Sequence, residues 1–142
     1  MVLKDFDYYI KKGIVRKRSA DIERAESLRC ESENICLSLI EYVENIGINP
    51  KNSNLIIRMA YDAIMELIRA QMLFDGFVSS GHGAHEAEVS YLRRFDFLES
   101  DVQFMDKLRY FRNGIIYYGK VFDKEYAEKV LEFLNKIKRM LK

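Results

Sequence analysis

The chain has 142 residues, of which 49% are apolar and 32% are charged, a composition typical of a folded globular protein rather than a disordered chain. Its 23 basic and 22 acidic residues leave a formal net charge of +1. No overall field therefore draws it to nucleic acid or to an acidic membrane, and an RNA contact requires a local patch. One proline and seven glycines argue against a turn-rich β-sandwich and favour long helices.

The N-terminal part of the chain is predicted to be an irregular or weakly helical arm. Tyr8 and Tyr9 can anchor it, and residues 11–18 form a basic stretch. The length fits a single domain over residues 1–142. Within it we expect an arm, 1–18, followed by a helical bundle, 19–142.

Two long amphipathic helices are predicted next. Apolar residues recur at three- and four-residue steps from Ser19, a residue type that favours a helix N-cap, to Gly47. A second stripe begins around Asn52 or Ser53 and stops at Gly76.

The two cysteines, Cys30 and Cys36, fall within the first of these helices. Six residues of helix separate them by about 9 Å along the axis and turn them in different directions, so they cannot form a disulfide. Two free thiols are typical of a reducing cytosol. Because no apolar run approaches the roughly 20 residues that span a bilayer, we expect a cytoplasmic protein without membrane contact.

The C-terminal half contains shorter elements. Residues 79–83 are predicted to be a loop, followed by a short helix. Ser100 and Gln103 form a capping box that opens the next helix, Gly119 ends it, and Asp123 caps the last one. No strand pattern competes, so the predicted fold class is all-α, an up-and-down helical bundle of four to five helices.

Residues able to carry chemistry gather in the segment 109–119. Arg109, Arg112 and Asn113 lie on one side of the predicted helix, and Tyr117 follows one turn later. An arginine fork beside an amide and a phenol can hold a phosphate and a ribose or base. Gly114 costs the helix about 1 kcal/mol relative to alanine, which predicts close approach of a neighbouring backbone.

The pair Arg112–Asn113, followed at a fixed short distance by a polar ring, resembles the signature of the HEPN family. In that family an arginine and a polar residue precede a histidine by four to six positions near the C-terminus of a bundle helix. Residues 75–85 are also similar to the connection, containing glycine and histidine, that follows the second helix in some prokaryotic members. With the order of the helices, the resemblance covers residues 20–140.

The resemblance implies a metal-independent endoribonuclease, often the toxin partner of a minimal nucleotidyltransferase, that acts as a homodimer with its motif helices facing each other. It implies RNA or a nucleotide as ligand and no cofactor. Arg112 would bind the phosphate, Asn113 would position the RNA, and Glu66 or Asp62 would orient Arg112.

This sequence departs from the family at the general base, because Tyr117 occupies the place of the histidine. A phenol with a pKa near 10 is a poor base at neutral pH, although it can donate a hydrogen bond or stack on a base. The sequence therefore favours binding over cleavage. In the family, a tyrosine near the motif can be adenylylated by the partner, which makes Tyr118 a candidate modification site.

His82 and His85 are the side chains with ordinary pKa values near neutrality. They are either a loop residue and a helix-capping residue or, for one of them, a substitute for the missing base near Arg112. No cysteine or acidic cluster at ligand spacing accompanies them, so no metal site is expected.

Three other interpretations remain open at this point. Arg112 and Asn113 can belong to a structural polar network between helices. The chain can be a catalytically silent interaction module, or the nucleotide-binding subunit of a split nucleotidyltransferase, an idea that rests on fold analogy alone.

Overall fold

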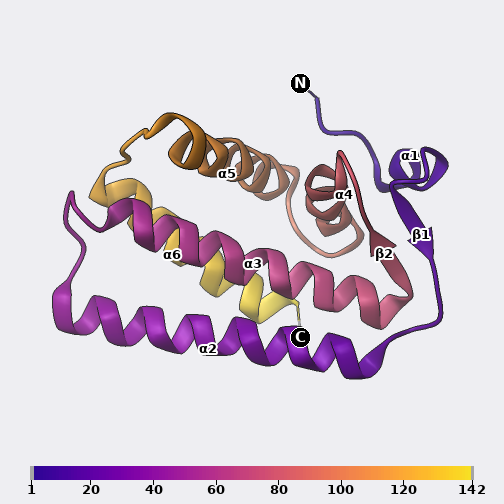
Figure 1. The fold of residues 1–142 in the computed structure, drawn as a ribbon, viewed down its shortest axis with the longest axis horizontal. Helices are drawn as coiled ribbons and strands as arrows, with labels where there is room; N and C mark the ends of the chain where they lie inside the picture. The colour runs from indigo at the N-terminus through magenta and orange to yellow at the C-terminus, as the bar shows by residue number, and fades with distance from the viewer. Residues whose placement is uncertain (1, 142) are drawn as a thin grey trace.

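A computed structural model of the chain describes residues 2–141, with the backbone alone at residues 116–118 (Figure 1). Over this range six α-helices and one two-stranded antiparallel sheet are present. In chain order the elements are α1 (Phe6–Lys11), β1 (Val15–Lys17), α2 (Ile22–Ile46), α3 (Ser53–Asp75), β2 (Phe77–Ser79), α4 (Ala84–Ser90), a 3-10 turn (Tyr91–Arg94), α5 (Glu99–Tyr118) and α6 (Lys124–Met140).

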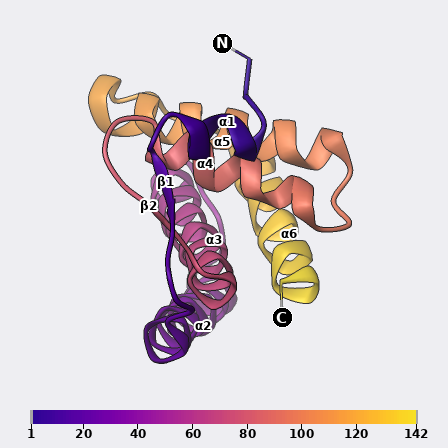
Figure 2. The ribbon, with the colours of Figure 1, turned by 90° about the vertical axis from the view of Figure 1, so that its right-hand side faces the viewer.

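Helix α3 is the central element of the fold. It packs against α2 on one side, against α6 behind, and against α4 and α5 on the side opposite α2 (Figures 1 and 2). Successive long helices alternate in direction along the molecule (Figure 1), and α5 crosses over α3 (Figure 2). The predicted all-α bundle is confirmed, with α1 as a helix beyond the four to five expected.

Small residues set the close packing of α2 on α3. Ala25 and Ser32 of α2 and Ala60, Ala63 and Ala70 of α3 are buried, so the two backbones can approach closely. The hydroxyl of Ser32 donates a hydrogen bond to the carbonyl of Ala63 at 2.8 Å. This bond satisfies a polar group that is sealed between the helices.

Several helix ends lie where local signals place them. Gly76 ends α3 and Gly119 ends α5, both in the left-handed conformation, which glycine adopts without the steric cost of a side chain. Asp123 accepts a hydrogen bond from the backbone N–H of Tyr126 at 2.8 Å and caps α6. These predictions are confirmed.

Two predicted N-caps are wrong. Helix α2 is capped by Asp21, not Ser19, because the backbone N–H of Asp21 is bonded to the carbonyl of Leu73 and this contact holds the preceding residues against α3. Helix α5 begins before Ser100, and the carboxylate of Asp101 accepts from the backbone N–H of Leu98 at 3.2 Å.

The N-terminal segment, expected to be irregular or weakly helical, contains the helix α1 and, in addition, a strand that was not expected. Strand β1 pairs with β2, with Val15 opposite Ser79 and Lys17 opposite Phe77. Gly76 makes the junction possible, since a Cβ there would lie 2.6 Å from the carbonyl oxygen of Arg18. The pairing joins residues some 60 apart, so local sequence patterns do not reveal it.

Both cysteines lie on α2, as predicted, and both are free thiols; Cys30 is exposed and Cys36 is buried. Within residues 2–141, no helix combines the length and the apolar composition that crossing a bilayer requires.

Candidate functional site

The guanidinium of Arg112 lies between α5 and α3 with part of its hydrogen-bonding capacity unused. Its central carbon is 5.3 Å from the centroid of the Tyr61 ring, and its nearest carboxylate oxygen, Oδ1 of Asp62, is 3.7 Å from Nη2. Its Nε is buried and has no acceptor among the described residues. The side chain as a whole is 28% exposed, so solvent or a ligand can reach part of it, although not the buried Nε.

Tyr61 forms the floor beneath this guanidinium. The residue is buried, and burial raises the pKa of its phenol to about 12, against the opposing effect of Arg112 and Arg109. The phenol is therefore neutral at physiological pH. Its ring face attracts the cation, which is the geometry of a cation–π contact.

Arg109 lies one turn before Arg112 and has a different role. Its guanidinium pairs with Glu86 of α4 and with Asp106 of α5, each at 3.0 Å. These carboxylates compensate its charge and tie α5 to α4. Arg109 therefore supports the site without offering a free cation, whereas the sequence grouped it with Arg112.

Of the two acidic residues expected to orient Arg112, Asp62 forms the contact and Glu66 does not. Glu66 lies one turn further along α3, and its Oε2 is buried without a hydrogen-bond partner in the described part of the chain. Burial raises the pKa of this carboxyl, Glu31 raises it further, and Arg69 opposes the change. Asn113 is half-buried, and its amide forms no hydrogen bond with another described residue.

The histidines lie beside a network centred on Glu88 of α4. The Glu88 carboxylate is buried and accepts from Nε of Arg69 at 3.0 Å and from the hydroxyl of Ser79 at 2.8 Å. Its second oxygen is 3.1 Å from Nδ1 of His85, whose ring is largely exposed. His82 is exposed in the loop before α4 and lies outside this network.

Tyr61 lies within electrostatic range of both the arginines of α5 and the Glu88 network. The charges of Arg112, Arg109, Glu88 and Arg69 all act on the pKa of its phenol. Among the described residues, Arg112 is the one whose cation lies over its ring. No group of three metal-ligating side chains is present in the described part of the chain.

Three expectations concern the end of α5. The backbone of Tyr117 and Tyr118 is helical, but their side chains lie outside the described residues, so their proposed roles remain predictions. The close backbone approach predicted at Gly114 is wrong, since among the described residues a Cβ there would meet the side chain of Lys120 alone, at an ordinary 3.5 Å.

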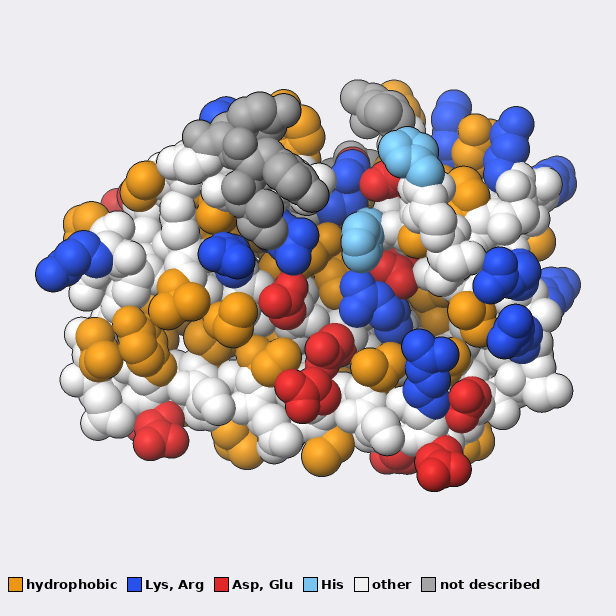
Figure 3. Space-filling view, viewed as in Figure 1, with side chains coloured by type: hydrophobic (Ala, Val, Ile, Leu, Met, Phe, Trp, Pro, Cys, Tyr) orange, Lys and Arg blue, Asp and Glu red, His pale blue; other side chains and the backbone are white. Residues whose placement is uncertain are grey.

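Figure 3 shows this face of the molecule from the direction of Figure 1. Both histidines and a mixed group of cationic and anionic side chains lie above α3 in its central part, and apolar side chains cover the left part. The two histidines therefore lie among charged side chains in this view, beside a region richer in apolar ones.

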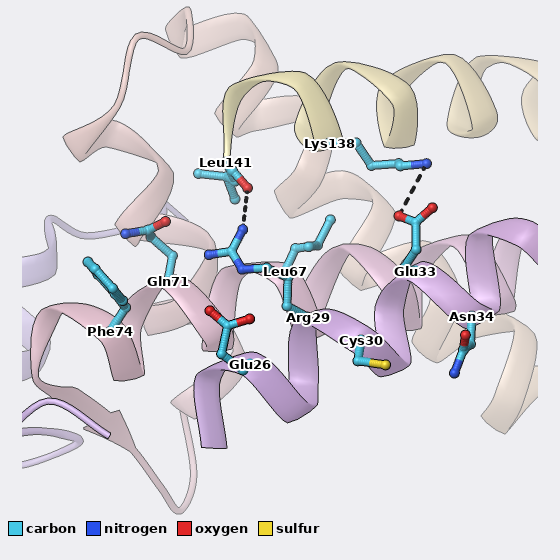
Figure 4. Close-up of a pocket in the computed structure, with 10 residues that line it drawn as sticks. All are labelled: Glu26, Arg29, Cys30, Glu33, Asn34, Leu67, Gln71, Phe74, Lys138 and Leu141. Carbon is cyan, nitrogen blue, oxygen red and sulfur yellow. Dashed lines mark hydrogen bonds and ion pairs between the residues drawn. The ribbon is translucent and has the colours of Figure 1, made fainter. Parts of the chain in front are cut away.

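A separate hollow of about 720 Å³ lies between α2, α3 and the end of α6 (Figure 4). Three of its charged side chains have partners there: Arg29 donates to the carbonyl of Leu141 at 3.0 Å, and Lys138 lies 3.6 Å from Glu33. None of the residues singled out from the sequence for chemistry lines this hollow.

Comparisons of the chain with models of protein families, with curated proteins and with solved structures find no match. The interpretation of the site therefore rests on its geometry.

Sequence reasoning missed Tyr61, Arg69 and Glu88. A usable signal existed for Tyr61, because α3 is apolar around most of its circumference, which is typical of a helix buried at the centre of a fold. Arg69 and Glu88 join helices that are distant in sequence, and no local pattern marks them.

Proposed function

We propose that this chain is a HEPN-like protein that binds RNA or a nucleotide, with Arg112 holding a phosphate and Asn113 contacting the adjoining sugar or base. The observation that carries the proposal is the state of Arg112. Its Nε is buried without an acceptor among the described residues, and its one carboxylate partner is 3.7 Å away.

A phosphate suits this position better than the carboxylate already there. Arginine presents donors in a planar fork that matches two phosphate oxygens, and such charge-assisted bonds are normally 2.7–2.9 Å long. The distance to Asp62 exceeds this range. Asp62 thus acts as a loose internal partner that an incoming anion displaces.

Cleavage is not part of the proposal. Tyr117 replaces the histidine of the family motif, and a phenol is a weak base at neutral pH. A nucleotidyltransferase partner and a toxin role in such a pair remain predictions that follow from the resemblance alone. A homodimer across α5 also remains a prediction.

The test is binding of a fluorescently labelled single-stranded RNA to the protein and to Arg112→Ala. Loss of charge-assisted bonds to a phosphate should weaken binding by about 10- to 100-fold. Arg112→Lys keeps the positive charge but not the planar fork of donors, so its RNA affinity should lie between those of the unchanged protein and Arg112→Ala. Arg139→Ala removes an exposed cation on α6 and serves as the control.

Parallel incubations with and without EDTA report any RNA cleavage and its dependence on metal. A protein that binds no RNA would behave as the silent interaction module and overturn the proposal. RNA binding that is the same in Arg112→Ala and Arg139→Ala would place the RNA elsewhere on the molecule.

A further inference from the structure

The N-terminal segment displays five cations that no carboxylate neutralises. We name them the basic edge: Lys11, Lys12, Arg16, Lys17 and Arg18. All five are exposed, and in the described range none forms an ion pair. The sequence has no acidic residue between Asp7 and Asp21, so the segment supplies no acid of its own.

The basic edge has a fixed support. Val15 is 1% exposed and belongs to the main core. The backbone N–H of Arg18 donates to the carbonyl of Gly76 at 2.8 Å, and that of Ser80 donates to the carbonyl of Ile14 at 3.0 Å. A surface held in place in this way loses less conformational freedom on binding than a flexible arm.

The strand geometry directs the charges outward. Val15 points into the core, Arg16 lies on the opposite face of the strand, and Lys17, although on the face of Val15, is exposed at the end of the strand. The guanidinium of Arg16 donates to the hydroxyl of Ser80 at 3.0 Å. This partner is neutral, so it positions the guanidinium without compensating its charge.

An aromatic ring lies beside Lys12 of the basic edge. Tyr8 is 40% exposed, and the ammonium groups of Lys4 and Lys12 lie 5.8 and 5.6 Å from the centre of its ring. Its neighbour Tyr9 is buried and packs edge-on against it. Surfaces that bind single-stranded nucleic acid combine such a ring, on which a base stacks, with cations for the phosphates.

The basic edge lies next to the candidate site. Strand β1 pairs with β2, which leads through the loop bearing His82 into α4. In Figure 3 cationic side chains gather on the right, in the region where Figure 1 places α1 and β1. Glu86 of α4 pairs with Arg109 of α5 at 3.0 Å, so the basic edge is connected through β2 and α4 to the helix that bears Arg112.

We propose that the basic edge and Tyr8 bind the phosphates and a base of single-stranded RNA, as a second contact surface for the strand held at Arg112. This inference rests on the proposed function. RNA suits the edge better than an anionic membrane, because within residues 3–21 of the described structure Tyr8 is the one large apolar side chain that is exposed, and membrane-surface segments bury a broad apolar face.

The experiment measures binding of a labelled 16-nucleotide single-stranded RNA at several salt concentrations. Two variants are compared, and each loses four positive charges. The edge variant loses them from the basic edge, and the control variant loses them from exposed positions on α6 and in the turn before α3. The edge variant is Lys11→Gln, Lys12→Gln, Arg16→Gln and Lys17→Gln. The control variant is Lys51→Gln, Lys124→Gln, Lys129→Gln and Arg139→Gln.

The edge variant should bind about 10- to 100-fold more weakly at low salt, and the slope of log affinity against log salt should fall by about 3. The control should stay within about 2-fold of the unchanged protein, and Arg112→Ala should lower the slope by less than about 1. Circular dichroism checks that both quadruple variants fold.

Equal binding by the edge and control variants, with Arg112→Ala still defective, overturns the inference and leaves the proposed function intact. Absence of RNA binding by the unchanged protein overturns both. Vesicles of phosphatidylserine and phosphatidylcholine form the last arm: loss of vesicle binding in the edge variant, with RNA binding unaltered, assigns the edge to membranes and overturns the inference.

Discussion

The guanidinium of Arg112 and the carboxylate of Asp62 lie 3.7 Å apart, whereas Arg109, on the same side of α5, has two carboxylates at 3.0 Å. The two arginines therefore differ in what they can still bind. Arg109 is compensated by its own protein, and Arg112 retains capacity for an outside anion. The first two predictions follow from this difference.

Asp62→Asn should strengthen RNA binding. The substitution removes the negative charge that competes with phosphate at Arg112 and keeps the shape of the side chain. We expect about a 3- to 10-fold gain in affinity, of the order of a partly exposed ion pair, measured by fluorescence anisotropy. If Asp62 instead holds Arg112 in its productive position, binding will weaken, and the competitive role assigned to Asp62 is wrong.

Tyr61 should contribute to binding through its ring and not through its hydroxyl. Tyr61→Phe keeps the face over which Arg112 lies, so RNA affinity should change little. Tyr61→Leu removes the cation–π contact, worth about 0.5–2 kcal/mol, and should weaken binding by about 2- to 30-fold. Equal losses in both variants would assign the role to the phenolic group.

Glu66→Gln should stabilise the protein at neutral pH and lose this advantage in acid. Burial raises the pKa of Glu66 above 4.5, and the nearby carboxylates of Glu31 and Asp62 add to it while Arg69 opposes it. The pKa of Glu66 is higher in the folded protein than in the unfolded one. The protonated carboxyl therefore contributes its full stabilisation at pH values below the unfolded-state pKa. This stabilisation is lost as pH rises through the folded-state pKa.

Thermal unfolding of Glu66→Gln and the unchanged protein at pH 7 and at about pH 4 measures this effect. We expect a higher Tm for the variant at pH 7 and nearly equal Tm values at the lower pH. Glu125→Gln, on the exposed first turn of α6, is the control. The same difference in Tm between Glu66→Gln and the unchanged protein at both pH values would contradict the raised pKa assigned to Glu66.

Gly76→Ala should destabilise the fold more than Gly119→Ala. Both glycines have positive φ, but a Cβ at Gly76 would lie 2.6 Å from the carbonyl oxygen of Arg18, and one at Gly119 would meet nothing within 4 Å. We expect losses of at least about 3 and of about 1–2 kcal/mol, respectively, by urea denaturation. Similar losses of stability in the two variants would show that the backbone around Arg18 can shift away from a side chain at position 76 with little loss of free energy.

Gly114→Ala should stabilise α5 by about 0.5–1 kcal/mol, the usual difference between these residues inside a helix. The added methyl group has an ordinary contact with the flexible side chain of Lys120. Urea denaturation provides the measurement. A loss of stability would indicate that something else packs closely on this position.

Local signals in the sequence were sufficient for most of the architecture. The long helices, their glycine ends and the cap at Asp123 depend on neighbours within a few residues, and these predictions are confirmed. The β1–β2 pair was missed because Val15 is held by residues far along the chain. No local pattern encodes that contact.

The candidate site was predictable only in part. The sequence placed Arg112 and an acid of the second long helix together, and the contact with Asp62 agrees with that expectation. It did not indicate that Arg109 is compensated by α4 or that Tyr61 lies beneath Arg112. Both depend on how α5 crosses α3, which is a property of the packed bundle.

The unequal burial of the two thiols on α2 has a practical consequence. A maleimide applied to the native protein should modify Cys30, which lines the hollow of Figure 4, and should spare Cys36, which is sealed in the core. A dye at the first cysteine gives a spectroscopic probe on that side of the molecule without any engineering. The second thiol reacts only when α2 separates from its neighbours, so its labelling rate reports how often the bundle opens.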